Sequence, residues 1–255
     1  MKNLPALVLA AGRGERMRPL TDVTPKPLLK VRGKPLLQWH LEALARAACP
    51  KVVINTAWLG EQIPATFGAA WDPARSGSPG SAMPLLYSDE QADFGGALET
   101  AGGVVRALPR LLADGEAAFW LVAGDVYVPE FEFGVEKAQA FLASDDWAHL
   151  WLVPNPAHHP QGDFGFAQVG GVGRVLDQGA QGERFTYSTM GLYRAAFFQA
   201  PQCDIPWGNP QGLRAALAPL LRRAIALGRV GATVYRGPWT DVGTPARLAE
   251  LNPGP

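Results

Sequence analysis

A dense group of glycine and cationic residues lies near the start of this 255-residue chain. Gly12 and Gly14 allow the backbone to turn sharply and to approach a ligand closely. The cations of the same stretch are Arg13, Arg16, Arg18 and Lys26. Pro25 and Pro27 stiffen the chain on either side of the lysine. Backbone N–H groups combined with guanidinium and ammonium groups are the donors that a polyphosphate requires, so the segment predicts a phosphate-binding loop.

The glycines do not complete either of two familiar phosphate-binding patterns. The Walker pattern requires Gly-Lys-Ser/Thr after four spacer residues, and this chain has Met17-Arg18-Pro19 there. The dinucleotide-binding pattern requires a third glycine where Met17 stands. A tight turn between a strand and a helix, with solvated arginines, is the alternative interpretation of this stretch.

Two polar residues follow buried strands further along the chain. Asp125 follows the apolar run 117–123 after Gly124, and a carboxylate at the end of a strand is a natural ligand for Mg²⁺ beside a phosphate. The alternative is an aspartate that caps the next turn. Asn55 ends the apolar run 51–55, where ligands bind in open α/β sheets. Its amide is equally suited to reading the edge of a base and to capping the following segment.

Alternating apolar segments predict an α/β fold with a Rossmann-like mixed, mostly parallel central sheet and helices on both faces. Helical spacing of leucines predicts a helix over 35–48, and another over 212–227 that Pro219 must kink or split. Strands are expected at 7–11, 51–55, 84–88, 117–123, 149–153, 185–193 and 231–235, with a hairpin over 166–176. Thr244 and Pro245 are expected to open the last helix.

The composition limits the classes of function. The chain is 47% hydrophobic and 18% charged with a net charge of zero, which is typical of a globular protein and offers no basic field for nucleic acid. No secretory signal or membrane-spanning run is present, so no membrane partner is expected. Cys49 and Cys203 lie far apart, which favours free thiols in the cytoplasm. We expect one domain over residues 1–255, and the oligomeric state stays open.

The N-terminal segment resembles the signature of the sugar-phosphate nucleotidyltransferases. The pattern is Gly12-x-Gly14-x-Arg16-x-x-Pro19-Leu20-Thr21, followed by Pro25-Lys26-Pro27. The segments 98–103 and 239–244 are similar to two further family segments, although Ala101 stands where close relatives have glycine and Ala123 where many have a polar residue. Together the matching segments extend from Leu7 to Leu248.

The resemblance implies a role for each matching residue. Arg16 and Lys26 would be catalytic, with the arginine on the departing pyrophosphate and the lysine on the reacting phosphates. Asp125 and Asp241 would hold Mg²⁺, or Mn²⁺ in its place, and should converge over the phosphate loop. Nucleotide-binding residues would be Ala11, Gly12, Gly14, Glu15, Asn55 and Glu90. Sugar-binding residues would be Glu99, Thr100, Asn155 and Thr186.

The implied reaction is transfer of a nucleoside monophosphate from a nucleoside triphosphate (NTP) to a sugar 1-phosphate, with release of pyrophosphate. The segment 155–164 is similar to the branch of the family that uses UTP and N-acetylmuramate 1-phosphate in cell-wall recycling, so these substrates are favoured. A mannose- or glucose-1-phosphate nucleotidyltransferase is the first alternative. A nucleotide-sensing subunit without catalysis is the second, and such a subunit should lack Lys26 or a metal-binding carboxylate.

Overall fold

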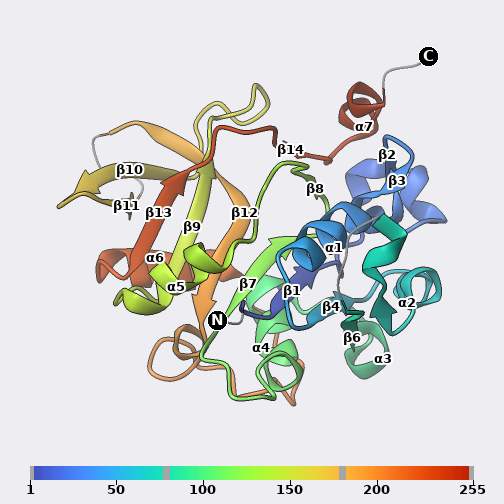
Figure 1. Cartoon of the computed structure of the whole chain (residues 1–255), viewed down its shortest axis with the longest axis horizontal. Helices are drawn as coiled ribbons and strands as arrows, with labels where there is room; N and C mark the ends of the chain where they lie inside the picture. Colours follow the sequence, from blue (N-terminus) through green and yellow to red (C-terminus); the bar gives the residue numbers. More distant parts are fainter. Residues whose placement is uncertain (1–2, 77–80, 178–181, 253–255) are drawn as a thin grey trace.

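The computed structural model describes residues 3–76, 81–177 and 182–252, and its centre is a ten-stranded mixed sheet. The strand order is β10-β11-β13-β9-β12-β7-β1-β4-β6-β5 (Figure 1). The strands are β1 (Ala6–Leu9), β4 (Val52–Thr56), β5 (Ala70–Trp71), β6 (Met83–Asp89), β7 (Ala118–Ala123), β9 (Ala148–Val153), β10 (Phe164–Val169), β11 (Val172–Leu176), β12 (Arg184–Arg194) and β13 (Val230–Val234).

The centre of the sheet is parallel, with one strand inserted in the opposite direction. β1 pairs in parallel with both β4 and β7, and β4 pairs in parallel with β6. β12 runs antiparallel to β7 on one side and to β9 on the other, and β13 continues in parallel beside β9. The strands β6, β4, β1, β7, β9 and β13 therefore point the same way, which confirms the expected mixed, mostly parallel sheet.

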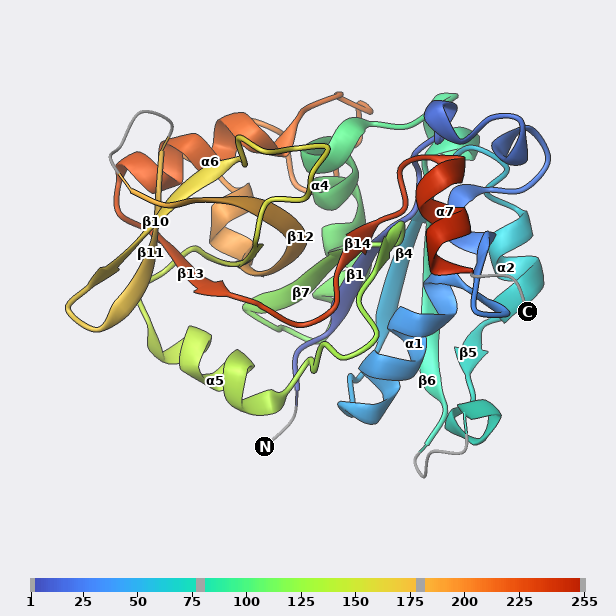
Figure 2. The same cartoon turned by 90° about the horizontal axis from the view of Figure 1, so that it is seen from above.

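Helices cover both faces of the sheet, as expected (Figure 2). Helices α4 and α6 lie on one face, and α1 and α5 lie on the other. The helices are α1 (Leu36–Arg46), α2 (Gln62–Phe67), α3 (Glu90–Phe94), α4 (Glu99–Leu111), α5 (Val135–Ala143), α6 (Leu217–Ala226) and α7 (Pro245–Leu251). Short 3₁₀ turns are η1 (Glu15–Met17), η2 (Leu20–Asp22), η3 (Lys26–Leu28), η4 (Pro73–Ser76) and η5 (Ala195–Phe198).

Each face of the sheet has its own apolar core. In β1, Ala6 and Val8 join the core beneath α1 and α5, whereas Leu7 joins the core beneath α4 and α6. This alternation follows from the two-residue period of a strand, and a strand buried on both faces must be apolar throughout. The rigid sheet centre that results holds the ends of β1, β4 and β7 in fixed relative positions.

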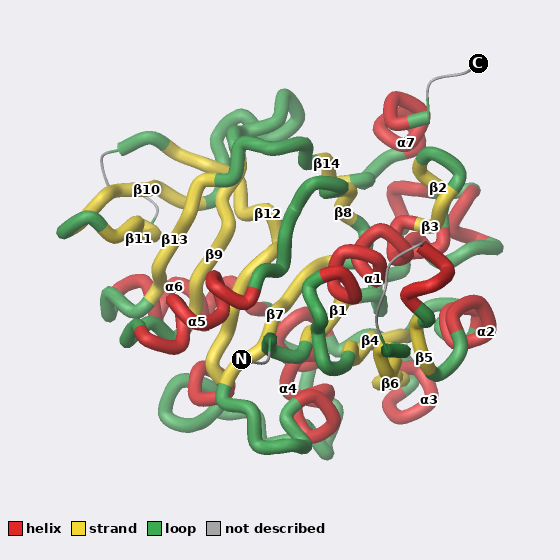
Figure 3. Tube along the Cα trace, in the orientation of Figure 1, coloured by secondary structure: helices red, strands yellow, loops and turns green. Residues whose placement is uncertain are grey.

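Two short strand pairs lie outside the main sheet. β2 (Lys30–Val31) pairs with β3 (Lys34–Pro35), and β8 (Val126–Tyr127) pairs with β14 (Thr240–Asp241). The C-terminal segment thus returns across the molecule to lie beside the chain that follows β7 (Figure 3). Helix α7 then packs on a third, smaller apolar cluster that includes Met17 and Val242.

The elements mostly lie where the sequence predicts them, with one clear exception. Helix α6 begins at Leu217, so the prediction of a helix from residue 212 is wrong. Pro219 stands in the first turn of α6, where its missing N–H costs no intrahelical hydrogen bond, and the helix is therefore shortened rather than kinked. Thr244 caps α7 and Pro245 opens it, as expected. Within the described residues, no helix is long and apolar enough to cross a membrane.

Candidate active site

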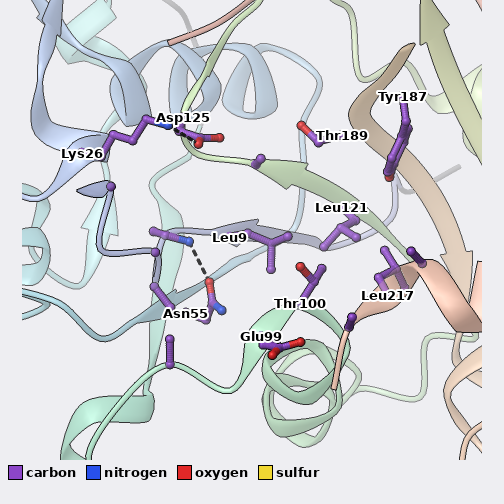
Figure 4. Close-up of a pocket in the computed structure, with 18 of the residues that line it drawn as sticks. Leu9, Lys26, Asn55, Glu99, Thr100, Leu121, Asp125, Tyr187, Thr189 and Leu217 are labelled. Atoms are coloured by element: carbon purple, nitrogen blue, oxygen red, sulfur yellow. Dashed lines mark hydrogen bonds and ion pairs between the residues drawn. The ribbon is translucent and has the colours of Figure 1, made fainter. Parts of the chain in front are cut away.

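A cleft of about 850 Å³ opens at the carboxyl ends of the parallel strands. Leu9 at the end of β1, Asn55 in β4 and Ala123 at the end of β7 contribute to its floor (Figure 4). Ligands bind at this edge of open α/β sheets because loops from several strands meet there. Of the predicted site residues, the cleft is lined by Ala11, Gly12, Gly14, Glu15, Arg16, Lys26, Asn55, Glu90, Glu99, Thr100 and Asp125.

The phosphate loop has a defined, non-helical shape. Gly14 adopts a left-handed conformation with φ of 66°, and a Cβ there would lie 3.2 Å from Thr21 and 3.3 Å from Lys26. The Thr21 hydroxyl donates to the Gly14 carbonyl at 2.9 Å, and the Met17 side chain is fully buried beneath the loop. Glycine is therefore required at position 14, and the loop is anchored at both ends.

The three arginines of this segment have different surroundings. The Arg13 guanidinium lies over the Trp58 ring at 4.2 Å, and Arg18 pairs with Asp22 at 3.1 Å. Arg16 alone of the three lines the cleft. The structure thus singles out the arginine that the family resemblance assigns to the pyrophosphate.

Lys26 and Asp125 form an ion pair in the wall of the cleft, at the carboxyl end of the sheet. Lys26 is only 8% exposed, and its ammonium lies 2.5 Å from Asp125 Oδ2 (Figure 4). The chain after Asp125 is fixed by His40 of α1, whose Nε2 lies 2.9 Å from the Val126 carbonyl. Complete burial lowers the pKa of His40 to about 4, so the ring is neutral and donates Nε2–H to that carbonyl.

Asp241 is brought beside Asp125 by the short strand pair β8–β14. The Val242 N–H donates to the Asp125 carbonyl at 3.0 Å, so the two aspartates lie on adjoining backbone. Asp241 pairs with Arg247, and its Oδ1 also lies 3.1 Å from His158 Nε2. His159 instead faces Asp163 at 3.1 Å, so the adjacent histidines have different partners.

The two aspartates supply the oxygen donors that Mg²⁺ prefers. Mg²⁺ is commonly held by one or two carboxylates together with waters and substrate phosphates. No group of three or more His, Cys, Asp or Glu side chains in residues 3–76, 81–177 and 182–252 is arranged to hold a metal ion. Each carboxylate is paired with a cation, Lys26 or Arg247. By donor type the two carboxylates fit a magnesium ion whose remaining ligands are substrate oxygens, and metal binding at Asp125 and Asp241 stays a prediction.

Asn55 and Glu90 form a buried hydrogen-bonded network where the cleft meets the end of β1. The Ala10 N–H donates to Asn55 Oδ1 at 2.7 Å, and Asn55 Nδ2 donates to Glu90 Oε1 at 2.7 Å. The Leu98 N–H donates to the other oxygen of Glu90 at 2.7 Å, and burial raises the pKa of this carboxyl above its ordinary value. Asn55 thus supports the end of β1 instead of capping its own following segment, and contact with a base stays a prediction.

Two residues on opposite sides of the cleft adopt strained backbone conformations. Glu99, the first residue of α4, has φ of 60°, and Thr189 in β12 has φ of 63°. Such values are uncommon for residues other than glycine, and for a β-branched threonine they are outliers. The pairing register of β12 with β9 shifts between Tyr187 and Met190, around this threonine. Strain held at two cleft positions is typical of a functional site.

Asn155 and Thr186, like Asp241, are predicted site residues that do not line the cleft. Asn155 accepts a hydrogen bond from the Thr186 hydroxyl at 3.0 Å and donates to the carbonyls of Pro160 and Arg184. These bonds hold the loop after β9 against β12. The structure therefore gives both residues a supporting role, and a direct sugar contact stays a prediction.

The far wall of the cleft contains residues that the sequence reasoning did not single out. They are Asp163, Phe164, Tyr187, Thr189, Leu217, Leu221 and Arg222. Asp163 accepts a hydrogen bond from the Tyr187 N–H at 2.8 Å, which ties the loop to β12. Leu217, Leu221 and Arg222 come from α6, and helical spacing marks the leucines only as core residues. Their place beside β12 depends on tertiary packing, so sequence offered no signal for it.

Comparison with known proteins identifies what this chain is similar to. A family model described as nucleotidyl transferase matches residues 5–254. The chain is 44% identical over 246 residues to the N-acetylmuramate alpha-1-phosphate uridylyltransferase of Neisseria meningitidis, covering 96% of this chain and 95% of that protein.

One further relative and one solved structure match this chain at lower coverage or at lower identity. The protein of the same description from Caulobacter vibrioides is 39% identical over 110 residues, 43% of this chain and 41% of its own. A solved structure from Bacillus anthracis, described as a glucose-1-phosphate thymidylyltransferase, superposes with a TM-score of 0.73 at 17% identity. It covers 98% of this chain and 94% of its own, and at that identity it supports the fold alone.

Proposed function

This chain belongs to the nucleotidyl transferase family, and from that premise we propose that it transfers UMP from UTP to N-acetylmuramate 1-phosphate. The observation that carries the proposal is the 44% identity to an N-acetylmuramate alpha-1-phosphate uridylyltransferase over 96% of this chain. Because the match also covers 95% of that relative, it includes both the phosphate loop and the far wall of the cleft.

The reaction joins the two substrates directly. An oxygen of the sugar phosphate attacks the α-phosphorus of UTP, a new P–O bond forms, and the bond to the β-phosphate oxygen breaks as pyrophosphate leaves. A phosphate monoester is already anionic near neutral pH, since its second pKa is about 6, so no general base is required. Catalysis then depends on positioning the two phosphates and on neutralising their charge.

Residues of the phosphate loop fit these two tasks. Lys26 projects its ammonium from a buried stem and would contact the phosphates of both reactants. Arg16, with the N–H groups of the loop from Gly12 to Gly14, would bind the departing pyrophosphate. These groups stabilise charge that moves onto the leaving group in the transition state.

Asp125 and Asp241 would hold the divalent cation, Mg²⁺ or Mn²⁺. When bound, this ion would neutralise phosphate charge beside Lys26. In the structure each carboxylate is held by a cationic side chain, so Lys26 and Arg247 keep both aspartates in place before substrate binds.

The nucleotide-sensing alternative is disfavoured because the chain retains Lys26 and both aspartates, and because the relative that it matches over 96% of its length is a uridylyltransferase. A mannose- or glucose-1-phosphate substrate remains the alternative that experiment must separate. We also propose that residues 1–255 form one domain that acts in the cytoplasm, with an NTP and a sugar 1-phosphate as its partners.

Pyrophosphate release tests the proposal. The full chain is assayed with Mg²⁺ and every pairing of UTP, GTP, CTP and dTTP with the 1-phosphates of N-acetylmuramate, N-acetylglucosamine, mannose and glucose. We expect the highest kcat/KM with UTP and N-acetylmuramate 1-phosphate. A maximum with another pair would refute the substrate, and silence with all pairs, while UTP still binds, would point to the sensing role.

A further inference from the structure

Among the described residues, three cationic side chains line the cleft. The proposed function assigns two of them to the phosphates of the substrates and gives the third no role. Arg16 and Lys26 come from the loop after β1, next to Asp125. Arg222 comes from α6, which packs on the α4 side of the sheet. Leu217 of the same helix and Tyr187 both lie on the side of the cleft away from Lys26 (Figure 4). The charge of Arg222 therefore enters the cleft from a different wall.

Arg222 has no anionic partner within the part of the chain that the structure describes. Other arginines of the fold are paired, as Arg106 is with Asp93, Arg174 with Asp146 and Arg247 with Asp241. The Arg222 guanidinium makes no such ion pair or hydrogen bond in residues 3–76, 81–177 and 182–252, and the residue is exposed. An unpaired guanidinium in a binding cleft offers its full set of donors to a ligand.

The surroundings of Arg222 strengthen any charge pairing made there. Leu217, Ala218 and Leu221 of the same helix line the cleft, and so do Phe164 and Tyr187. Apolar walls reduce the screening of a charge pair by water. A ligand group bound at this wall would thus gain most from being anionic.

Asp163 and Glu99, two acidic residues that line the cleft, do not form an ion pair with Arg222. Asp163 accepts from the Tyr187 N–H at 2.8 Å and lies 3.1 Å from His159, so both of its oxygens have other partners. Glu99 lies at the start of α4, and the described residues show no pair between Glu99 and Arg222.

We propose that Arg222 binds the carboxylate of an acidic sugar and selects an acidic sugar 1-phosphate over its neutral counterpart. The inference rests on the proposed function, because N-acetylmuramate carries a lactyl carboxylate that N-acetylglucosamine lacks. A guanidinium pairs with a carboxylate through two parallel hydrogen bonds, which gives direction as well as charge. Arg222 then acts as a specificity-determining residue, while Arg16 and Lys26 serve the phosphates.

The test compares substrates that differ only in that carboxylate. Wild type, Arg222→Met, Arg222→Lys and the control Arg223→Met are assayed with UTP and either N-acetylmuramate 1-phosphate or N-acetylglucosamine 1-phosphate. Arg223 lies next to Arg222 on α6 and is exposed, but it does not line the cleft. Thermal melting and the KM for UTP establish that each variant is folded and still binds nucleotide.

Arg222→Met should lower kcat/KM for the muramate substrate by about 10- to 100-fold, the loss of a charge-assisted pair, and leave the glucosamine substrate unchanged. Arg222→Lys should recover part of the loss, and Arg223→Met should match wild type. The methyl ester of the lactyl carboxylate should lower kcat/KM in wild type, and it should have no further effect in Arg222→Met.

Other outcomes would overturn the inference. Equal losses with both sugars would place Arg222 on a phosphate, and no loss with either would remove it from binding. If the wild type is active with N-acetylmuramate 1-phosphate and the Arg222→Met variant has the same kcat/KM, this inference alone is refuted. A wild type that prefers a neutral sugar would refute the proposed substrate together with it.

Discussion

The Lys26 ammonium lies 2.5 Å from the Asp125 carboxylate, although 99 residues separate them in the sequence. Lys26 comes from the loop after β1 and Asp125 from the end of β7, two strands that pair in parallel. The pair fixes a candidate phosphate-binding cation next to a candidate metal ligand. Four predictions follow from this arrangement and from the groups that hold it.

Lys26→Met should lower kcat by about 100-fold or more, because it removes a preorganised charge from the reacting phosphates. The stem of Lys26 is buried, and methionine preserves most of its apolar volume, so the melting temperature should stay close to wild type. The matched control is Lys30→Met, at an exposed lysine four residues later. Steady-state kinetics with full activity in Lys26→Met would remove this residue from catalysis.

Asp125→Asn and Asp241→Asn should each raise the Mg²⁺ concentration needed for half-maximal activity by about 10-fold or more, because a neutral amide is a weaker ligand for a hard cation. The measurement is a Mg²⁺ titration of pyrophosphate release, with the exposed Asp204→Asn as control. If the two variants keep the wild-type Mg²⁺ dependence, these aspartates do not hold the ion.

Gly14→Ala should lower the stability of the protein, whereas Gly12→Ala should weaken ligand binding without loss of stability. At Gly14 a methyl group would meet Thr21 and Lys26 in a left-handed conformation, which should cost about 1–2 kcal/mol of unfolding free energy. At Gly12 a Cβ meets nothing within 4 Å, so stability should hold while the KM for UTP rises. Denaturant unfolding and kinetics report the two effects, and a destabilised Gly12→Ala would contradict the open space there.

The unfolding free energy should fall as pH drops from about 6.5 toward 4, because burial lowers the pKa of His40 to about 4. In that window the unfolded chain binds a proton that folded His40 does not, so acid favours unfolding. The stabilisation lost is on the order of 3 kcal/mol, from 1.36 kcal/mol per pKa unit. His40→Gln, which keeps an N–H donor for Val126, should reduce the slope but not abolish it, because burial also lowers the pKa of His149 to about 4; an unchanged slope would remove His40 as a cause.

Much of the fold could be predicted from local pattern. The apolar run around Leu7 and Val8 predicts a doubly buried strand, and Thr244-Pro245 predicts the start of α7. Both follow from interactions within a few residues, since strand burial sets composition and a threonine hydroxyl caps the N–H groups just after it. The predicted start of α6 was wrong because the helical leucine spacing begins at Leu213, before the chain enters the helix at Leu217.

The candidate site also contains features that the local sequence predicts and features that only the tertiary structure sets. The sequence by itself determined that Asp125 follows a buried strand, and it predicted a phosphate-binding loop from the glycines, Arg16 and Lys26, because residue type and short spacing carry both signals. Only the tertiary structure decided that Arg13 stacks on Trp58, away from the cleft. It also turned Asn155 toward Thr186 and brought Arg222 into the lining of the same cleft as Tyr187.

The physical reason is how far apart in the sequence the interacting residues lie. Turns, caps and strand burial depend on neighbours in sequence, and these patterns can be read directly. The approach of Asp241 to Asp125 depends on the β8–β14 pairing, and the place of Arg222 depends on how α6 packs against α4 and β13. Such contacts are set by strand order and the packing of whole elements, and short-range periodicity carries no record of them.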